Sequence, residues 1–193
     1  MDERRAGAGE HPGELGVEVE GHGRAFSVRP ATLADAEGLR RMFSRASPET
    51  VRLRFHLPFP DVPGWMLSLM VDADHHGGES LVAVEGGEVV GHAMYVRLGS
   101  GAEAELAIVV EDGGQSRGAG KSLLSELSRR AGLRGVEAFT AEVRAENRPM
   151  LGLAVAFAGI RRATGGGVYR IRVSLGALDP AMHEAARPLR GAA

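Results

Sequence analysis

The sequence predicts one α/β (α+β) domain, in which helices and a largely antiparallel sheet follow one another along the chain. Two observations predict this class. Residues 25–71 carry one short alternating run and then apolar side chains at helical spacing, whereas residues 81–110 hold three alternating runs separated by glycine turns. Helical and alternating segments then alternate to the end of the domain. Strands gathered in one run between helices indicate an α+β arrangement.

The domain is expected to span residues 24–176. Residues 1–23 are rich in Gly, Glu and Arg and carry no periodic apolar pattern, so they are predicted to form a flexible tail. Residues 177–193 are predicted to form a second, C-terminal tail.

Helix starts are marked clearly in the first third of the chain. Thr32 is followed three residues later by Asp35, which resembles a capping box. Ser47 is a good N-cap, and Pro48 is pre-set for the first helical turn. The predicted elements here are a strand at 25–29 and helices at 32–45, 47–56 and 65–71.

Glycine turns organise the rest of the domain. Gly86-Gly87 between two alternating runs predicts a hairpin, and Gly99-Ser100-Gly101 predicts a second turn. A helix with apolar residues at 123, 124, 127 and 131 is expected to stop at Gly132 or Gly135. The predicted strands are 81–84, 89–96, 104–110, 136–143 and 168–175, with a further helix at 149–158.

Composition excludes several classes of protein. The 193 residues include no cysteine, which rules out disulfides, thiolate nucleophiles and Cys-ligated metals. A net charge of −2 argues against nucleic acid or an anionic membrane as partner. No run reaches the ~18 to 20 apolar residues of a spanning helix, and the N-terminus lacks an apolar signal core, so a cytoplasmic location is expected. His75-His76 has no ligand at metal-binding spacing, and no metal site is predicted.

Residues 115–122, Gln-Ser-Arg-Gly-Ala-Gly-Lys-Ser, join a buried strand to a helix and predict an anion-binding loop. Glycines allow close backbone approach, and amide groups at a helix N-terminus favour a pyrophosphate. Two known patterns fit incompletely. The P-loop would need glycine at position 115, which is Gln, and the dinucleotide fingerprint would need glycine at 123, which is Leu.

A third pattern fits without adjustment. Gln115-x-x-Gly118-x-Gly120 after the strand Leu106–Val110 resembles the acyl-CoA loop of the GNAT superfamily of N-acetyltransferases, and Glu146-Asn147 before an apolar helix agrees with it. The resemblance covers about residues 24–176. It implies the GNAT fold, a central mixed, mostly antiparallel sheet of about six to seven strands flanked by about four helices. Val28–Thr32 and Ser47–Phe55 look like the catalytic domains of bacterial protein lysine acetyltransferases.

The resemblance also implies acetyl-CoA as co-substrate. The strand residues would bind pantetheine through the main chain, the loop amides would bind the pyrophosphate, and Asn147 would bind the cofactor arm, although a helix cap is an equal alternative for Asn147. Arg144 and Arg148 flank this region, as candidates for the adenosine 3′-phosphate. The cofactor-binding residues expected are Ile108, Val109, Val110, Gln115, Ser116, Arg117, Gly118, Ala119, Gly120, Lys121, Ser122 and Asn147.

A protonated amine acceptor requires a base, because a lysine has a pKa near ~10.4. Glu105 is the candidate, a carboxylate in an otherwise apolar strand, and it matches the glutamate of the protein-acetyltransferase subgroup; Glu103, on the same face, is the reserve. Many family members place a tyrosine acid where this chain has Ala154.

These residues predict direct acetyl transfer to a primary amine, with protein lysine favoured as the acceptor. Small amines, amino acids and antibiotics are alternative acceptors, and a catalytically inactive acyl-CoA-binding regulatory module is an alternative function. A homodimer is left open. Lys121 is the chain's only lysine, so it is the one internal target if the enzyme acetylates lysines.

Overall fold

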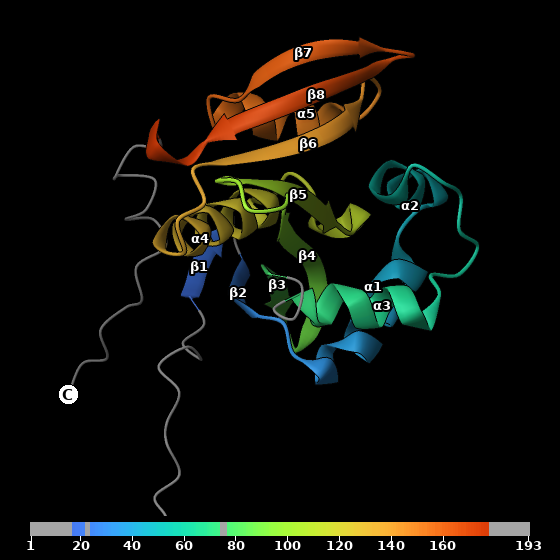
Figure 1. The fold of residues 1–193 in the computed structure, drawn as a ribbon. Coiled ribbons are helices and arrows are strands. Elements are labelled where there is room, and N and C mark those ends of the chain that lie inside the picture. The colour runs from blue at the N-terminus through green and yellow to red at the C-terminus, as the bar shows by residue number, and fades with distance from the viewer. Residues whose placement is uncertain (1–16, 22–23, 74–76, 178–193) are drawn as a thin grey trace, which may run out of the picture.

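A computed structural model describes residues 17–21, 24–73 and 77–177. It shows one sheet with helices on both faces (Figure 1). The strand order is β1-β2-β3-β4-β5-β6-β8-β7, and every neighbouring pair is antiparallel except β5 and β6. The strands are β1 Val17–Gly21, β2 Arg24–Pro30, β3 Gly78–Glu85, β4 Glu88–Arg97, β5 Glu103–Val110, β6 Ala138–Arg144, β7 Ile160–Gly165 and β8 Val168–Ser174.

Five α-helices lie within the described ranges, with short 3₁₀ turns between some elements. The α-helices are α1 Ala36–Arg45, α2 Pro48–Phe55, α3 Gly64–Val71, α4 Ala119–Leu133 and α5 Arg148–Ala156. The 3₁₀ helices are η1 Leu33–Asp35, η3 Asp112–Gly114 and η4 Leu175–Ala177. None of the helices described here is both long and apolar enough to cross a bilayer.

The sheet separates two cores. On one face, α4 and α5 pack against the strands through residues such as Leu123, Leu127 and Ala154. On the other face, α1, α2 and α3 bury residues such as Leu39 and Met70. Strand β5 contributes to both cores because its side chains alternate between the faces. A site that forms where β5 ends is therefore bordered by helices from both layers.

The local start and turn signals fold as the sequence predicts. The Ser47 hydroxyl caps α2 by accepting a hydrogen bond from the Thr50 amide at 3.2 Å. Asp35 closes the capping box by accepting from the Thr32 amide at 2.8 Å. Gly86 and Gly87 both have positive φ, as a two-residue turn between twisted antiparallel strands requires. The predicted fold class, a mixed and mostly antiparallel sheet flanked by helices, is confirmed.

Two edge strands were not anticipated. The sheet has eight strands, rather than six to seven, because β1 and β7 extend its two edges. All six residues of β7 are exposed, so this strand lacks the apolar alternation that identifies a half-buried strand. Strand β1 lies within residues 1–23, the stretch expected to be a tail, and it pairs with β2. The sheet therefore begins earlier in the chain than predicted. The other expected tail residues, 1–16, 22–23 and 178–193, lie outside the described ranges.

Candidate functional site

The sheet opens between β5 and β6. These strands pair in parallel only from Glu103 opposite Ala138 to Glu105 opposite Thr140. Beyond that point β5 continues to Val110 beside β4, and β6 continues to Arg144 beside β8. The main-chain groups of residues 106–110 that face β6 therefore have no strand partner in the described sheet. Such a fork offers an extended ligand the hydrogen bonds that a neighbouring strand would otherwise take.

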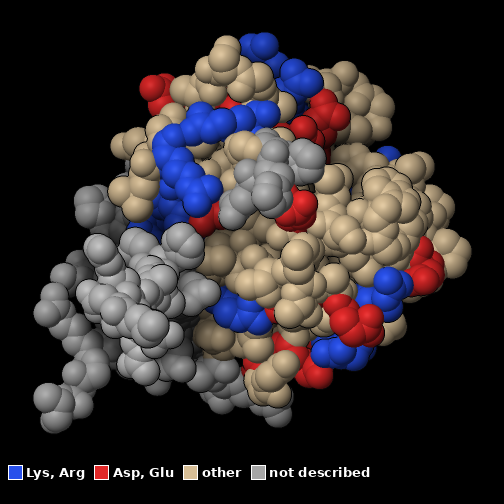
Figure 2. Space-filling model, turned by 60° about the horizontal axis from the view of Figure 1, so that its bottom comes forward, with Lys and Arg blue, Asp and Glu red and all other residues tan. Residues whose placement is uncertain are grey.

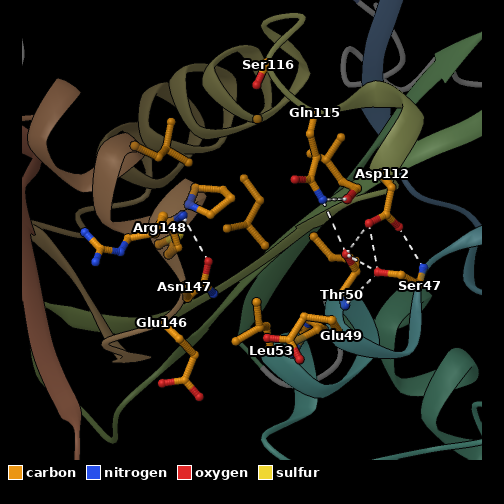
Figure 3. A pocket seen from close by; sticks show the side chains of 18 of the residues that line it. Ser47, Glu49, Thr50, Leu53, Asp112, Gln115, Ser116, Glu146, Asn147 and Arg148 are labelled. Carbon is orange, nitrogen blue, oxygen red and sulfur yellow. Dashed lines mark hydrogen bonds between the residues drawn. The ribbon is translucent and has the colours of Figure 1, made fainter.

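A cavity of about 610 Å³ occupies this opening. Its volume lies in the range of ~300 to 1,000 Å³ that is typical of small-molecule sites. Figure 3 shows side chains from α2, the end of β5, the following loop and α5 arranged around it. The lining residues are Ser47, Glu49, Thr50, Leu53, Arg54, Ile108, Val109, Val110, Asp112, Gln115, Ser116, Gly118, Gly120, Lys121, Glu146, Asn147, Arg148, Pro149, Met150 and Leu153.

One end of the cavity is formed by the glycine-rich loop and the start of α4. Gly118 caps α4 with φ of +98°, a conformation that glycine adopts without strain. Helix α4 has 15 residues and carries no acidic side chain in its first turn, so the positive end of its dipole is uncompensated by the helix itself. Lys121 is exposed and lines the cavity beside this end. This arrangement suits a phosphate or pyrophosphate.

Most of the expected cofactor-binding residues line the cavity, and three do not. The side chain of Arg117 is paired with Glu85 and donates to the Gly113 carbonyl at 3.1 Å, which holds the loop against β3. Ala119 is buried in the core, and Ser122 is outside the lining. Any contribution from these three residues would have to come from the main chain, and it stays a prediction.

Asn147 caps α5, one of the two roles that the sequence left open, and its surroundings are compatible with the other. Its Oδ1 caps α5 by accepting from the Met150 amide at 3.1 Å. The side chain also lines the cavity, and its Nδ2 makes no hydrogen bond to the residues described here. An asparagine can therefore hold the helix with its oxygen and offer its amide to a ligand.

The two candidate bases have different surroundings. Glu105 is the last β5 residue paired with β6, so it lies at the closed end of the fork. It is exposed and has neither a hydrogen bond nor an ion pair within the described part of the chain. Glu103 forms a salt bridge to Arg172 at 2.7 Å. Of the two candidate bases, Glu105 is therefore the one without an ion pair in the described chain, and it is not among the residues that line the cavity.

A hydrogen-bond network that the sequence did not reveal ties α2 to the glycine-rich loop. Asp112 accepts from the Ser47 amide at 2.7 Å, the Ser47 hydroxyl at 2.8 Å and the Thr50 hydroxyl at 2.9 Å (Figure 3). Burial opposes the charge of Asp112, but these hydrogen bonds outweigh it and hold its pKa below the usual range. Gln115 extends the network by donating to the Val110 carbonyl at 3.2 Å.

A second unexpected feature is a charged bridge from α2 to the loop before α5. Arg52 reaches Glu146 at 3.1 Å, and Glu146 also accepts from Arg144 at 2.6 Å. The hydrogen bond from Arg144 is the main cause that lowers the pKa of Glu146 to about 2. Arg144, a candidate for the adenosine phosphate, is therefore engaged by a carboxylate, whereas Arg148 is exposed, lines the cavity and has no partner in the described residues.

Other candidate groups lie elsewhere or in apolar surroundings. Ala154 is buried against the α4 side of the sheet, so the position of the usual tyrosine offers no side-chain acid. Tyr95 is buried in the same core. The described ranges contain no cluster of three or more side chains placed to bind a metal ion, and His75-His76 lies outside them.

The residues present fit an acyl-CoA. The fork leaves strand amides and carbonyls without a strand partner, the start of α4 suits a pyrophosphate, and an asparagine amide lines the same cavity. Residues 39–159 match the model of the acetyltransferase (GNAT) family. Comparison with curated proteins gives no match.

Solved structures agree with the family model. The GNAT domain of S. lividans PAT is 30% identical, with a TM-score of 0.78 over 86% of this chain and 99% of that domain. Two more distant structures share the fold. The yncA protein of Salmonella typhimurium, determined with its cofactor acetyl-CoA, is 20% identical, with a TM-score of 0.64 over 78% of this chain and 94% of its own. The ribosomal-protein-alanine N-acetyltransferase of Brucella melitensis is 22% identical, with a TM-score of 0.61 over 75% and 96% of the two chains.

The family assignment also gives the activity class, acetyl transfer, and the acetyl donor, acetyl-CoA. Both the family model and a relative at 30% identity cover most of the domain that carries the fork, the loop and α5. The chain belongs to the GNAT family of acetyltransferases, enzymes that take the acetyl group from acetyl-CoA.

Proposed function

We propose that this enzyme acetylates the side-chain amine of protein lysines by direct transfer, with Glu105 as the base. The observation that carries the proposal is the position of Glu105. It is a carboxylate without an ion pair in the described chain, and it lies where the fork between β5 and β6 closes. An ammonium acceptor must lose a proton before it can attack, and Glu105 would accept it.

The proposed roles of the other residues follow from the cavity. Acetyl-CoA supplies the acetyl group as an activated thioester. Main-chain groups of Ile108, Val109 and Val110 would hold the pantetheine arm, and an amide there would stabilise negative charge on the carbonyl oxygen. The loop amides and Lys121 would bind the pyrophosphate. With no cysteine in the chain, no cysteinyl acyl-enzyme can form, which favours direct transfer.

The preference for protein lysine depends on α2. The segment Ser47–Phe55, whose sequence resembles bacterial protein lysine acetyltransferases, forms the helix that borders the cavity on the Glu105 face of β5. The acceptor side of the site is therefore built from the part of the chain that carries the resemblance. Tyr95 is buried in the core, and Tyr169 lies outside the cavity lining with Arg161 over its ring, so water is the proposed proton donor to the departing thiolate.

The test is an assay of CoA release with matched acceptors. Lysine-containing peptides, the same peptides with lysine replaced by arginine, and peptides with only a free N-terminal amine are compared with free amino acids and aminoglycosides. Release with the lysine peptides alone, and an added acetyl group on Nε by mass spectrometry, is expected. Release with only α-amines or only small amines would overturn the choice of acceptor.

A further inference from the structure

Arg54 lines the cavity but has no ion-pair partner among the described residues. It lies near the end of α2 and makes no hydrogen bond to any residue that the structure describes. Its Nε is fully buried without a hydrogen-bond partner. The neighbouring Arg52, by contrast, is paired with both Glu49 and Glu146. The two arginines lie on the same helix, but Arg52 has two ion-pair partners and Arg54 has none among the described residues.

The groups that face Arg54 leave its charge uncompensated. Glu105, on β5, is the one carboxylate that attracts it appreciably, from beyond salt-bridge distance. His92, on β4, is fully buried, and burial followed by repulsion from Arg54 lowers the pKa of His92 to about 3, so this ring is neutral near pH 7. The Phe55 ring lies 5.0 Å from the guanidinium carbon and offers only a weak cation–π contact.

Arg54 is half-buried, with its Nε shielded from solvent, and a cation in such a position without a counter-ion is costly. Burial is the dominant effect on Arg54 and lowers its pKa to about 10, which reflects the loss of hydration. Buried charges in proteins are normally paired or bind an ion. Arginine in particular presents a planar fork that matches a carboxylate. A ligand anion in the cavity would supply the missing partner.

We propose that Arg54 forms a carboxylate-binding subsite on the acceptor side of the cavity, so that the preferred acceptor carries a carboxylate close to the amine that is acetylated. This inference rests on the proposed function, because it takes Glu105 as the group that receives the amine. Two acceptors share this chemistry: a lysine with an acidic residue beside it, and a free amino acid with its own α-carboxylate.

Steady-state kinetics on matched acceptors test the subsite. One pair of peptides differs only in Glu or Gln next to the lysine, and a second pair is a free amino acid and its α-amide. A charge-assisted hydrogen bond contributes ~1.5 to 3 kcal/mol, so the carboxylate form of the matching pair should be favoured at least about tenfold in kcat/KM. The pair that shows the preference identifies the source of the carboxylate. No preference in either pair would overturn the proposal.

Variants locate the effect. Arg54→Gln should abolish the preference for the carboxylate without changing the affinity for acetyl-CoA, and Arg54→Lys should retain part of it. Arg41→Gln, which removes the same charge from the exposed, Glu88-paired Arg41 on α1 outside the cavity, should keep the full preference. A preference that survives in Arg54→Gln would overturn the assignment.

Thermal denaturation tests the carboxylate subsite through the Tm, which can be measured even when a variant has no activity. Because Arg54 has no protein partner, Arg54→Met should fold and melt no lower than the wild type, whereas loss of a structural ion pair would lower the Tm. In the wild type loaded with acetyl-CoA, N-acetylglycine should raise the Tm and N-acetylglycinamide should not, and Arg54→Met should remove the difference. Equal shifts with both probes overturn the subsite, whereas absent acetylation of every amine overturns the proposed function.

Discussion

Glu105 and Glu103 lie two residues apart on one face of β5, and their partners distinguish them. Glu103 is held by Arg172, so its carboxylate is satisfied, whereas Glu105 is left without an ion pair in the described chain at the closed end of the fork. The strand alternation places both carboxylates on the face of β5 that packs toward α1, α2 and α3. Sequence favoured Glu105 over Glu103, but the ion pair that occupies Glu103 could not be predicted, because Arg172 lies on β8, 69 residues away.

The first prediction concerns this pair. Glu105→Gln keeps the shape of the side chain and removes its ability to accept a proton. We expect turnover of the amine acceptor to fall by ~10²-fold or more, while the Kd for acetyl-CoA stays within about twofold. Glu103→Gln is the matched control and should keep near wild-type turnover. Stopped-time CoA release and calorimetric titration measure the two quantities, and equal losses in both variants would contradict the role of Glu105.

The second prediction concerns the contribution of Lys121 to the binding of acetyl-CoA. Lys121 is exposed, it lines the phosphate end of the cavity, and it is the only lysine available for self-modification. Lys121→Met should weaken acetyl-CoA binding by roughly tenfold, the scale of one charge-assisted hydrogen bond, and Lys121→Arg should restore most of the loss. Direct titration of the variants with acetyl-CoA is the measurement. An unchanged Kd in Lys121→Met would remove this residue from the binding site.

At the level of elements, Asp35 stabilises the junction between β2 and α1 through a hydrogen bond and an ion pair. Its carboxylate accepts from the Thr32 amide and pairs with Arg29 at 2.7 Å. Burial acts to raise the pKa of Asp35, but the Arg29 and Thr32 hydrogen bonds lower it below the usual value. An acid with a depressed pKa stabilises the fold above its unfolded pKa of ~3.9, and that stability is lost as the pH falls through the lower, folded value.

The third prediction follows from this sign. Asp35→Asn should lower the free energy of unfolding by about 1 to 2 kcal/mol at pH 7. The difference from the wild type should shrink as the pH falls from about 4 through the lower, folded pKa of Asp35, because the wild-type carboxyl then becomes protonated as well. Urea denaturation at several pH values measures it. A difference that stays constant down to pH 2 would show that the charge of Asp35 is irrelevant.

Elements also show where sequence reasoning stops. Ser47, Gly86-Gly87 and Gln115-x-x-Gly118-x-Gly120 were predictable because cap, turn and loop signals act over a few residues. Strand β7 was not, since both its faces are exposed and no apolar pattern marks it. The contacts of Asp112 with α2 span 62 to 65 residues, and an unpaired Arg54 looks in sequence like any solvated arginine. Long-range pairing and selective burial are properties of the assembled fold.

At the scale of the whole molecule, charge is balanced locally. Acidic and basic side chains lie near one another over the visible face of the surface, around a broad uncharged area (Figure 2). The many arginine–carboxylate pairs between elements account for this pattern, for example Arg45 with Glu111 at 2.8 Å. Exposed pairs of this kind contribute little to stability one by one, so the two apolar cores supply most of it.

The fourth prediction concerns stability of the whole domain. Because the fork, the loop and α5 belong to one cooperative structure, acetyl-CoA that binds only the folded state must stabilise all of it. At 100 times its Kd the ligand should add about 2.7 kcal/mol, which corresponds to a rise of roughly 5 to 10 °C in Tm for a domain of this size. Differential scanning fluorimetry against acetyl-CoA concentration measures the shift. No shift at saturation would contradict binding at this site.

The contact between Asp112 and Ser47 has one more consequence, which concerns the coupling between donor and acceptor. Asp112 belongs to the segment that leads into the glycine-rich loop, and Ser47 caps α2, the helix that carries Arg54. These hydrogen bonds couple the position of the loop to the position of α2. We therefore expect a ligand that orders the loop to order α2 as well, so that binding of acetyl-CoA favours binding of the acceptor.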